Sequence, residues 1–191
     1  MPPTPVRSAE AVLVPRAGDN DPMDDWERRV DAVWTHAAGA DRPDDDELLA
    51  RIDALASELD TGDPRGTFER AGARDSTGRT AEAIALYREA LDGGLDPDRR
   101  RQAAVQLASS LRAIGEADEA VRILADELDR GESLLEPQVR AFYALALADT
   151  GREREAVGIA VETIGSLVTR YRRSLVAYGQ DMADGPSAPT P

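Results

Sequence analysis

The sequence predicts an all-α fold, built as an array of antiparallel helix hairpins. The pattern Gly-x-x-x-Glu-Ala begins at Gly78, Gly115 and Gly151, which are 37 and 36 residues apart. A sequence period of about 20–50 residues indicates a repeat architecture. Ala, Leu and Val supply most of the 41% apolar residues, whereas aromatic residues make up only 4%. That balance is typical of helices packed on helices and makes a β-rich fold improbable.

The N-terminal region is expected to hold a disordered arm followed by one short helix. Residues 1–23 contain five prolines and too little apolar surface to offset the entropy of ordering. Residues 24–38 are expected to be an amphipathic helix, because Trp26, Val30 and Trp34 recur at helical spacing. The two tryptophans are expected either to dock this helix on the array or to mediate self-association.

A leading helix and three hairpins follow the amphipathic helix. The leading helix begins at residue 44 and carries regularly spaced leucines behind an acidic first turn, which suits the positive helix N-terminus. Each hairpin begins with an acid before a proline, a pair that can cap a helix and fill its first position. These pairs are Asp63-Pro64, Asp96-Pro97 and Glu136-Pro137, and the hairpins are expected at about 63–95, 96–131 and 136–164.

The repeated glycine and alanine have separate expected roles within each hairpin. The glycine ends the first helix with a positive φ, a conformation that is easiest without a Cβ. The alanine five residues later lets the second helix pack closely on the first. After the third hairpin, a cap helix over 166–180 is expected to cover the last apolar face, and residues 181–191 are expected to be a disordered tail. The stripe assigned to that cap helix is Leu167, Val168, Tyr171, Leu175 and Tyr178.

These residues resemble the signature of the tetratricopeptide repeat, which has small residues at fixed helix positions, a turn glycine and a buried aromatic. The chain is most similar to the bacterial group-5 subfamily over residues 44–180, and it departs from the signature at Glu127 and Thr163, which replace a late alanine. The resemblance implies a right-handed superhelix with a concave groove and a protein partner, and it leaves a homodimer open. The matching residues are Ala71, Gly78, Ala83, Tyr87 and Ala90 in the first repeat, Ala108, Gly115, Ala120 and Leu124 in the second, and Ala144, Gly151, Ala156 and Ala160 in the third.

The resemblance also implies that the first helices of the hairpins line the groove. The expected surface is mixed, and it would suit a helix or extended segment with an apolar stripe and some acidity. The Lys/Asn/Arg clamp by which chaperone-binding relatives hold a terminal carboxylate is not matched. An alternative is that these residues pack against the leading helix or a dimer mate. The groove residues are Arg65, Phe68, Gly72, Asp75, Gln102, Val105, Ser109, Arg112, Gln138, Ala141, Leu145 and Ala148.

Missing residue types argue against catalysis and cofactors. The chain has no Lys and no Cys, and His36 is its single histidine, so a Schiff base, a thiolate nucleophile and a Cys-ligated zinc have no residues to form them. We expect no catalytic residue, no metal site and no cofactor. The net charge of −14 disfavours nucleic acid and anionic membranes as partners, and the arginine clusters at 99–101 and 170–173 are expected to be solvated.

An interaction module, acting as a non-enzymatic adaptor or regulator, is therefore the leading functional expectation. The alternative is a small ligand-binding or hydrolytic protein that uses carboxylates in the groove. A third possibility is a structural subunit whose groove is filled permanently by a neighbour. The longest apolar run near the N-terminus, Val12-Leu13-Val14, is too short for a signal peptide, and a cytoplasmic location is expected.

Overall fold

A computed structural model describes residues 25–131 and 135–184, and every regular element in those ranges is a helix. The predicted all-α array of helix hairpins is confirmed for this part of the chain. The expected arm at 1–23 and the end of the expected tail lie outside the described residues. The chain divides into two compact units, residues 1–99 and 100–191, and each is described by itself.

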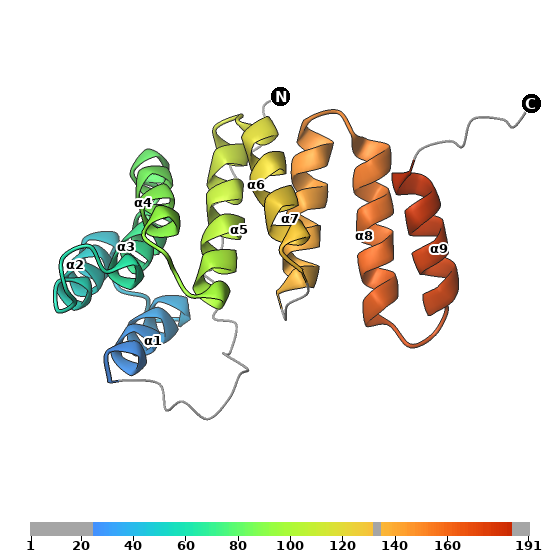
Figure 1. Cartoon of the computed structure of the whole chain (residues 1–191). Helices are drawn as coiled ribbons and strands as arrows, with labels where there is room; N and C mark the ends of the chain where they lie inside the picture. Colours follow the sequence, from blue (N-terminus) through green and yellow to red (C-terminus); the bar gives the residue numbers. More distant parts are fainter. Residues whose placement is uncertain (1–24, 132–134, 185–191) are drawn as a thin grey trace, which may run out of the picture. The chain divides into compact units, whose positions relative to one another are not determined.

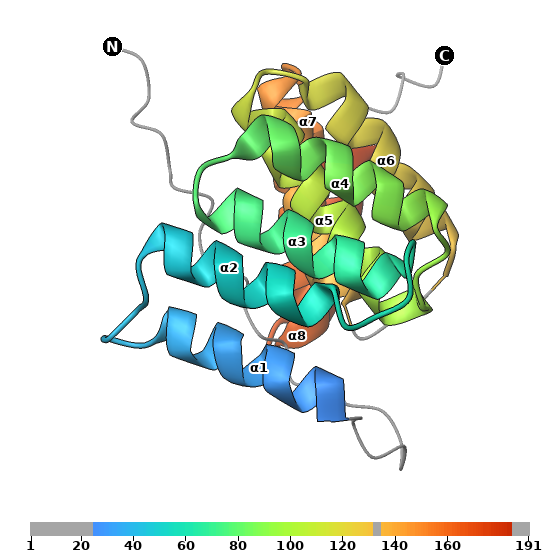
Figure 2. The same cartoon turned by 90° about the vertical axis from the view of Figure 1, so that its left-hand side faces the viewer.

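The first unit consists of four helices, each packed on the next in chain order (Figures 1 and 2). Its core gathers the two tryptophans of the first helix with the leucines and isoleucine of the second. The repeat residues Ala71, Ala83 and Tyr87 are fully buried between the third and fourth helices. The helices are α1 (Asp25–Ala38), α2 (Asp45–Ala56), α3 (Pro64–Ser76) and α4 (Thr80–Asp92).

The second unit contains the other two hairpins and a final helix. Helix α5 (Pro97–Ala113) begins in the first unit, and its residues from Arg100 onward belong to the second. Small or apolar repeat residues fill the interior here as well, because Ala108, Ala120 and Leu124 are fully buried. The remaining helices are α6 (Ala117–Asp129), α7 (Glu136–Asp149), α8 (Glu153–Leu167) and α9 (Arg172–Ala183).

The three repeat glycines make the same turn, as the sequence predicted. Gly78, Gly115 and Gly151 have φ values of 77°, 89° and 78°. The residue after each glycine donates its backbone N–H to a carbonyl five residues earlier, as in Glu116 to Leu111 at 2.9 Å, which is the Schellman closure. A Cβ on any of these glycines would meet no atom within 4 Å. Backbone conformation, rather than crowding, therefore requires glycine here.

Two of the three predicted acid caps form, and the third does not. The Asp63 carboxylate accepts the Arg65 backbone N–H at 2.9 Å, and the Asp96 carboxylate accepts that of Arg99 at 3.0 Å. Helix α7 instead begins at Glu136 itself, with Leu135 as its N-cap residue and no side-chain cap. The Glu136 carboxylate instead accepts a hydrogen bond at 2.8 Å from the guanidinium of Arg140, one helical turn later, and it does not cap the helix.

The end of the chain differs from the sequence prediction. Helix α8 runs through Gly165 to Leu167, and α9 begins at Arg172, six residues after the expected start of the cap helix. Gly165 is a packing position rather than a helix stop, because a Cβ there would lie 3.0 Å from the Leu175 side chain. The expected buried stripe is also largely wrong, since Leu167, Tyr171 and Tyr178 are exposed.

Glycines bring α8 and α9 into close contact, and the two helices lie side by side and antiparallel (Figure 1). A Cβ on Gly179 would lie 2.6 Å from the Glu162 nitrogen and 2.7 Å from the Gly158 oxygen. A Cβ on Gly158 would lie 2.6 Å from the Ala183 nitrogen. Such distances leave no room for side chains at Gly158 and Gly179, so backbone packs on backbone at these two positions.

Candidate partner-binding surface

Helix α1 is docked within the first unit by its tryptophans. Trp26 and Trp34 are 6% and 8% exposed. The Trp26 indole Nε1 donates to the Leu55 carbonyl at 2.8 Å, and the Trp34 Nε1 donates to the Glu69 carboxylate at 2.7 Å. Burying an indole with its N–H paired is favourable on both apolar and polar grounds. The structure thus places both indoles against α2 and α3, where they are not open to a second chain.

Two of the four groove residues predicted on α3 pack within the first unit. Phe68 is buried and meets the Tyr87 ring at a centroid distance of 6.3 Å. The Arg65 guanidinium pairs with Asp63 at 2.8 Å and lies 5.4 Å from the centre of the Trp26 ring. The hydrogen bond from Arg65 lowers the pKa of Asp63. The other two are Gly72, which is buried, and Asp75, which is half-buried near the end of α3.

An ion cluster that the sequence did not predict fixes α1 from the other side. The Arg99 guanidinium is almost fully buried and binds both Glu27 of α1 and Asp96, the latter at 2.6 Å. Burial pushes the pKa of Asp96 up, but the backbone and guanidinium hydrogen bonds from Arg99 outweigh it and lower the pKa. Glu27 and Arg99 are 72 residues apart in the sequence, so no local sequence pattern could have predicted this pair.

The rest of the first arginine cluster is also structural rather than solvated. Arg100 pairs with Glu127 of α6, and Arg101 donates to the Gly131 carbonyl at 2.5 Å. Arg101 and Glu127 are both buried. Glu127 is the residue that departs from the repeat signature, and the departure is explained because its carboxylate neutralises an arginine where the signature places alanine.

The remaining predicted groove residues lie on α5 and α7 of the second unit. The C-terminal ends of these helices are joined by an ion pair of 2.6 Å between Arg112 and Asp149. The α5 residues are half-buried, whereas the α7 residues are exposed, and Leu145 is 48% exposed. We call these residues the α5/α7 face: Gln102, Val105, Ser109, Arg112, Gln138, Ala141 and Leu145.

The α5/α7 face combines aliphatic side chains with polar ones. Val105, Ala141 and Leu145 provide aliphatic surface, and the amides of Gln102 and Gln138 can each donate to and accept from a peptide backbone. Arg112 is already neutralised by Asp149 within the chain, so it offers less charge to an acidic partner than the sequence suggested. The face therefore favours apolar contact over charge.

A shallow pocket of about 400 Å³ lies elsewhere in the second unit, among α7, α8 and α9. Its two carboxylates, Glu136 and Glu162, both lie against Arg140, at 2.8 and 3.4 Å. Both pocket carboxylates are therefore held in ion pairs with the same arginine, and this arrangement gives no support to hydrolysis by them.

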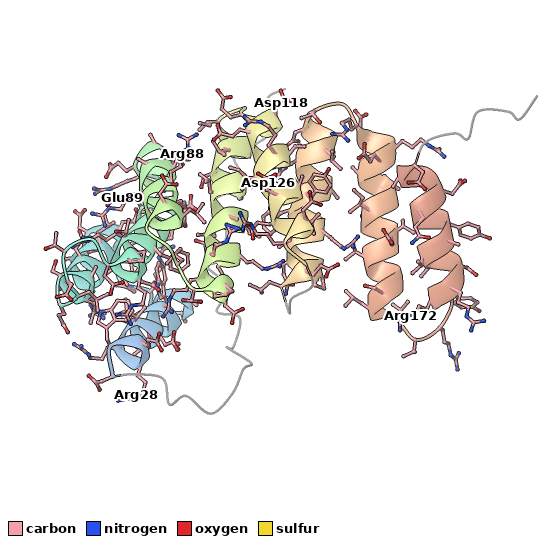
Figure 3. All side chains as sticks on the ribbon, in the orientation of Figure 1. Arg28, Arg88, Glu89, Asp118, Asp126 and Arg172 are labelled. Carbon is pink, nitrogen blue, oxygen red and sulfur yellow. The ribbon has the colours of Figure 1, made fainter. Side chains whose placement is uncertain are left out.

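The described part of the chain has neither a metal-binding cluster nor a membrane-spanning helix. Within residues 25–131 and 135–184, no three His, Cys, Asp or Glu side chains cluster in a way that could hold a metal ion. No helix in these ranges is long and apolar enough to cross a membrane. Figure 3 shows acidic and basic side chains spread over all of the helices, among them Glu89, Asp118 and Arg172.

Comparison with known proteins gives one match. The sequence profile of the family described as tetratrico peptide repeat matches residues 64–182, a range that begins with the first residue of α3 and ends one residue before the end of α9. Searches of curated proteins and of solved structures returned no significant match.

Proposed function

Because the chain belongs to the tetratricopeptide-repeat family, of the group-5 type, we propose that it is a non-enzymatic interaction module that binds a protein segment on its α5/α7 face. Repeats of this family are generally protein–protein interaction modules. The proposed partner is a helix or an extended segment with an apolar stripe. We also propose that the chain self-associates and acts in the cytoplasm as an adaptor or regulator.

One observation carries the choice of surface. Leu145 of the α5/α7 face is a large aliphatic side chain that is 48% exposed. The predicted groove residues on α3 are less available, since Arg65 contacts Trp26 and Phe68 contacts Tyr87. Ala141, one helical turn before Leu145, is also exposed, and an exposed apolar group bordered by polar residues is typical of binding sites. The uncovered half of the predicted groove is therefore the better candidate.

The proposed binding is tested with displayed peptides, since the partner is unidentified. A library of random peptides is selected on the full chain, and the best peptide is synthesised with a fluorescent label for anisotropy titration. Leu145→Arg is expected to weaken binding by about tenfold or more, because a central apolar anchor is replaced by a charge. Its matched control is Ile114→Arg, which puts the same charge on an exposed aliphatic residue just after α5 and outside the α5/α7 face.

Two results would contradict the choice of surface. Equal binding by Leu145→Arg and the unmodified chain would move the site elsewhere. Loss of binding in both arginine variants would show that the added charge, rather than the position, is responsible. Circular dichroism of each variant checks that the helices remain folded.

A further inference from the structure

The last two helices carry most of the exposed large apolar side chains of the described chain. Five of seven such residues fall between Val157 and Tyr178, and Tyr171 and Tyr178 are 81% and 67% exposed. Single exposed apolar residues are ordinary, but a group on neighbouring helices is not. Since glycines hold α9 on α8, these side chains have no part in that contact.

Four of these five exposed side chains share one face of the helix pair. On α8, buried Ala156, Ile159 and Thr163 are directed to the interior, and Gly158 and Gly165 touch α9. Helical spacing puts exposed Val157 and Ile164 on a third side of α8. On α9, Arg172 and Val176 line the pocket. The opposite flank carries exposed Tyr178 and the exposed N-cap residue Tyr171, together with half-buried Leu175 and Met182. We call these six residues the α8/α9 face: Val157, Ile164, Tyr171, Leu175, Tyr178 and Met182.

The size of the α8/α9 face limits how tightly it can bind. Helices of 15 and 12 residues are about 22 and 18 Å long, and each is about 10 Å across. The face therefore covers roughly 400 Å² in plan, which is a typical size for an interaction patch. A stable interface needs about 800 Å² from each partner. Binding through this face is expected to be weak and to depend on concentration.

The charges at the two ends of α9 indicate which partner fits the α8/α9 face. Arg170 and Arg173 lie at the N-terminal end of α9, and Asp181 and Asp184 lie at its other end. Neither of those arginines has an ion pair within the described residues, and Asp181 has only a 3.9 Å contact with Arg154. Figure 3 shows the labelled Arg172 at the arginine end, beside the α8–α9 turn. A helix that is basic at one end and acidic at the other complements a copy of itself laid antiparallel.

We propose that the α8/α9 face binds the same face of a second copy of this chain, with the two α9 helices antiparallel. A two-fold axis midway between Tyr171 and Met182 would set each of these residues opposite the other, and Leu175 opposite Tyr178. Tyrosine against a thioether or an aliphatic chain is a favourable contact. The same axis brings Arg170 of one copy near Asp181 of the other. This inference names the surface for the self-association proposed above, and rests on that proposal.

The test is sedimentation velocity on the full chain over a concentration series from 1 μM to about 500 μM, the range in which a weak interface is half-occupied. The chain is expected to shift from monomer to dimer with rising concentration. Tyr178→Arg is expected to weaken the dimer at least tenfold, while Ile114→Arg, which adds the same charge at an exposed aliphatic residue outside both faces, leaves it unchanged. Circular dichroism and labelled-peptide binding are measured on both variants as checks on folding and on the α5/α7 face.

Charge reversal tests the antiparallel arrangement. Arg170→Asp and Asp181→Arg are each expected to weaken the dimer severalfold at low salt, and the double reversal to restore it. Failure of the double variant to recover would refute the antiparallel pairing. A monomer at every concentration would refute self-association altogether. A dimer that survives Tyr178→Arg, or that is lost only on deletion of residues 1–23, would keep self-association and overturn the α8/α9 face.

Discussion

The glycine contact between α8 and α9 predicts that adding one methyl group will loosen the end of the chain. In Gly179→Ala, the new Cβ would begin 2.6 Å from the Glu162 nitrogen and 2.7 Å from the Gly158 oxygen. An ordinary contact of about 3.4 Å requires the helices to separate by roughly 0.7 Å, and overpacking of this kind costs about 1–3 kcal/mol. Alanine returns about 1 kcal/mol in helix propensity. The net expected loss is about 0–2 kcal/mol.

The matched control separates packing from propensity. Ala177 lies two residues away in the same helix and is exposed, so Ala177→Gly measures the glycine cost without any contact and should lose about 1 kcal/mol. Unfolding by urea gives the stability of each variant, and hydrogen exchange gives the local opening of α9. Gly179→Ala should accelerate exchange in α9 before the rest of the second unit. A gain in stability equal in size to the loss in Ala177→Gly would refute the close backbone contact.

Two further predictions concern the first unit. Arg99→Met removes the cation between Glu27 and Asp96 and should lower the free energy of unfolding by about 2–3 kcal/mol, less than for a fully buried pair because Asp96 is 42% exposed. It should also shift the emission of the two tryptophans, both in α1, to longer wavelengths. Arg28→Met, an exposed change on α1, should leave the emission wavelength unchanged. The pKa values of Asp63 and Asp96 are lowered in the folded chain, so their stabilisation is present above the unfolded value near 4 and is lost as pH falls through the lower folded value. Urea unfolding between pH 6 and pH 2 should show this loss, and Asp96→Asn should flatten it; an unchanged pH dependence in that variant would remove Asp96 as its source.

The sequence predicted the repeat elements because their signals are local. Gly115 and its turn, or Asp63 and Pro64, lie within a few residues of the structure they specify, and the structure has those elements as expected. Contacts between distant residues left no such pattern, as with Glu27 and Arg99. Periodicity predicted that α1 has one apolar stripe, but it left open whether the stripe docks on the array or mediates self-association.

The C-terminal helix shows a different reason for failure. A stripe of Tyr171, Leu175 and Tyr178 was expected to be the buried side of the cap helix because helix packing normally uses large apolar residues. The structure buries Gly179 instead, and two of the three large residues are exposed. A glycine inside a helix is a weak signal on its own, since the same residue also ends helices at Gly78 and Gly151. Its meaning depends on the backbone of another helix, which no local pattern contains.

The two ends of the repeat region are therefore finished in different ways. Terminal helices of a repeat array need a polar outer surface for solubility. Helix α1 meets that need in the first unit, because its tryptophans are directed inward and its outer positions carry ion pairs such as Arg29 with Glu58 at 2.5 Å. Helix α9 does not meet it, because Tyr171 and Tyr178 remain exposed. An exposed apolar face at a terminal helix is what one more packed element would cover, and in the proposed dimer the second α9 would be that element, with opposite charge facing each end.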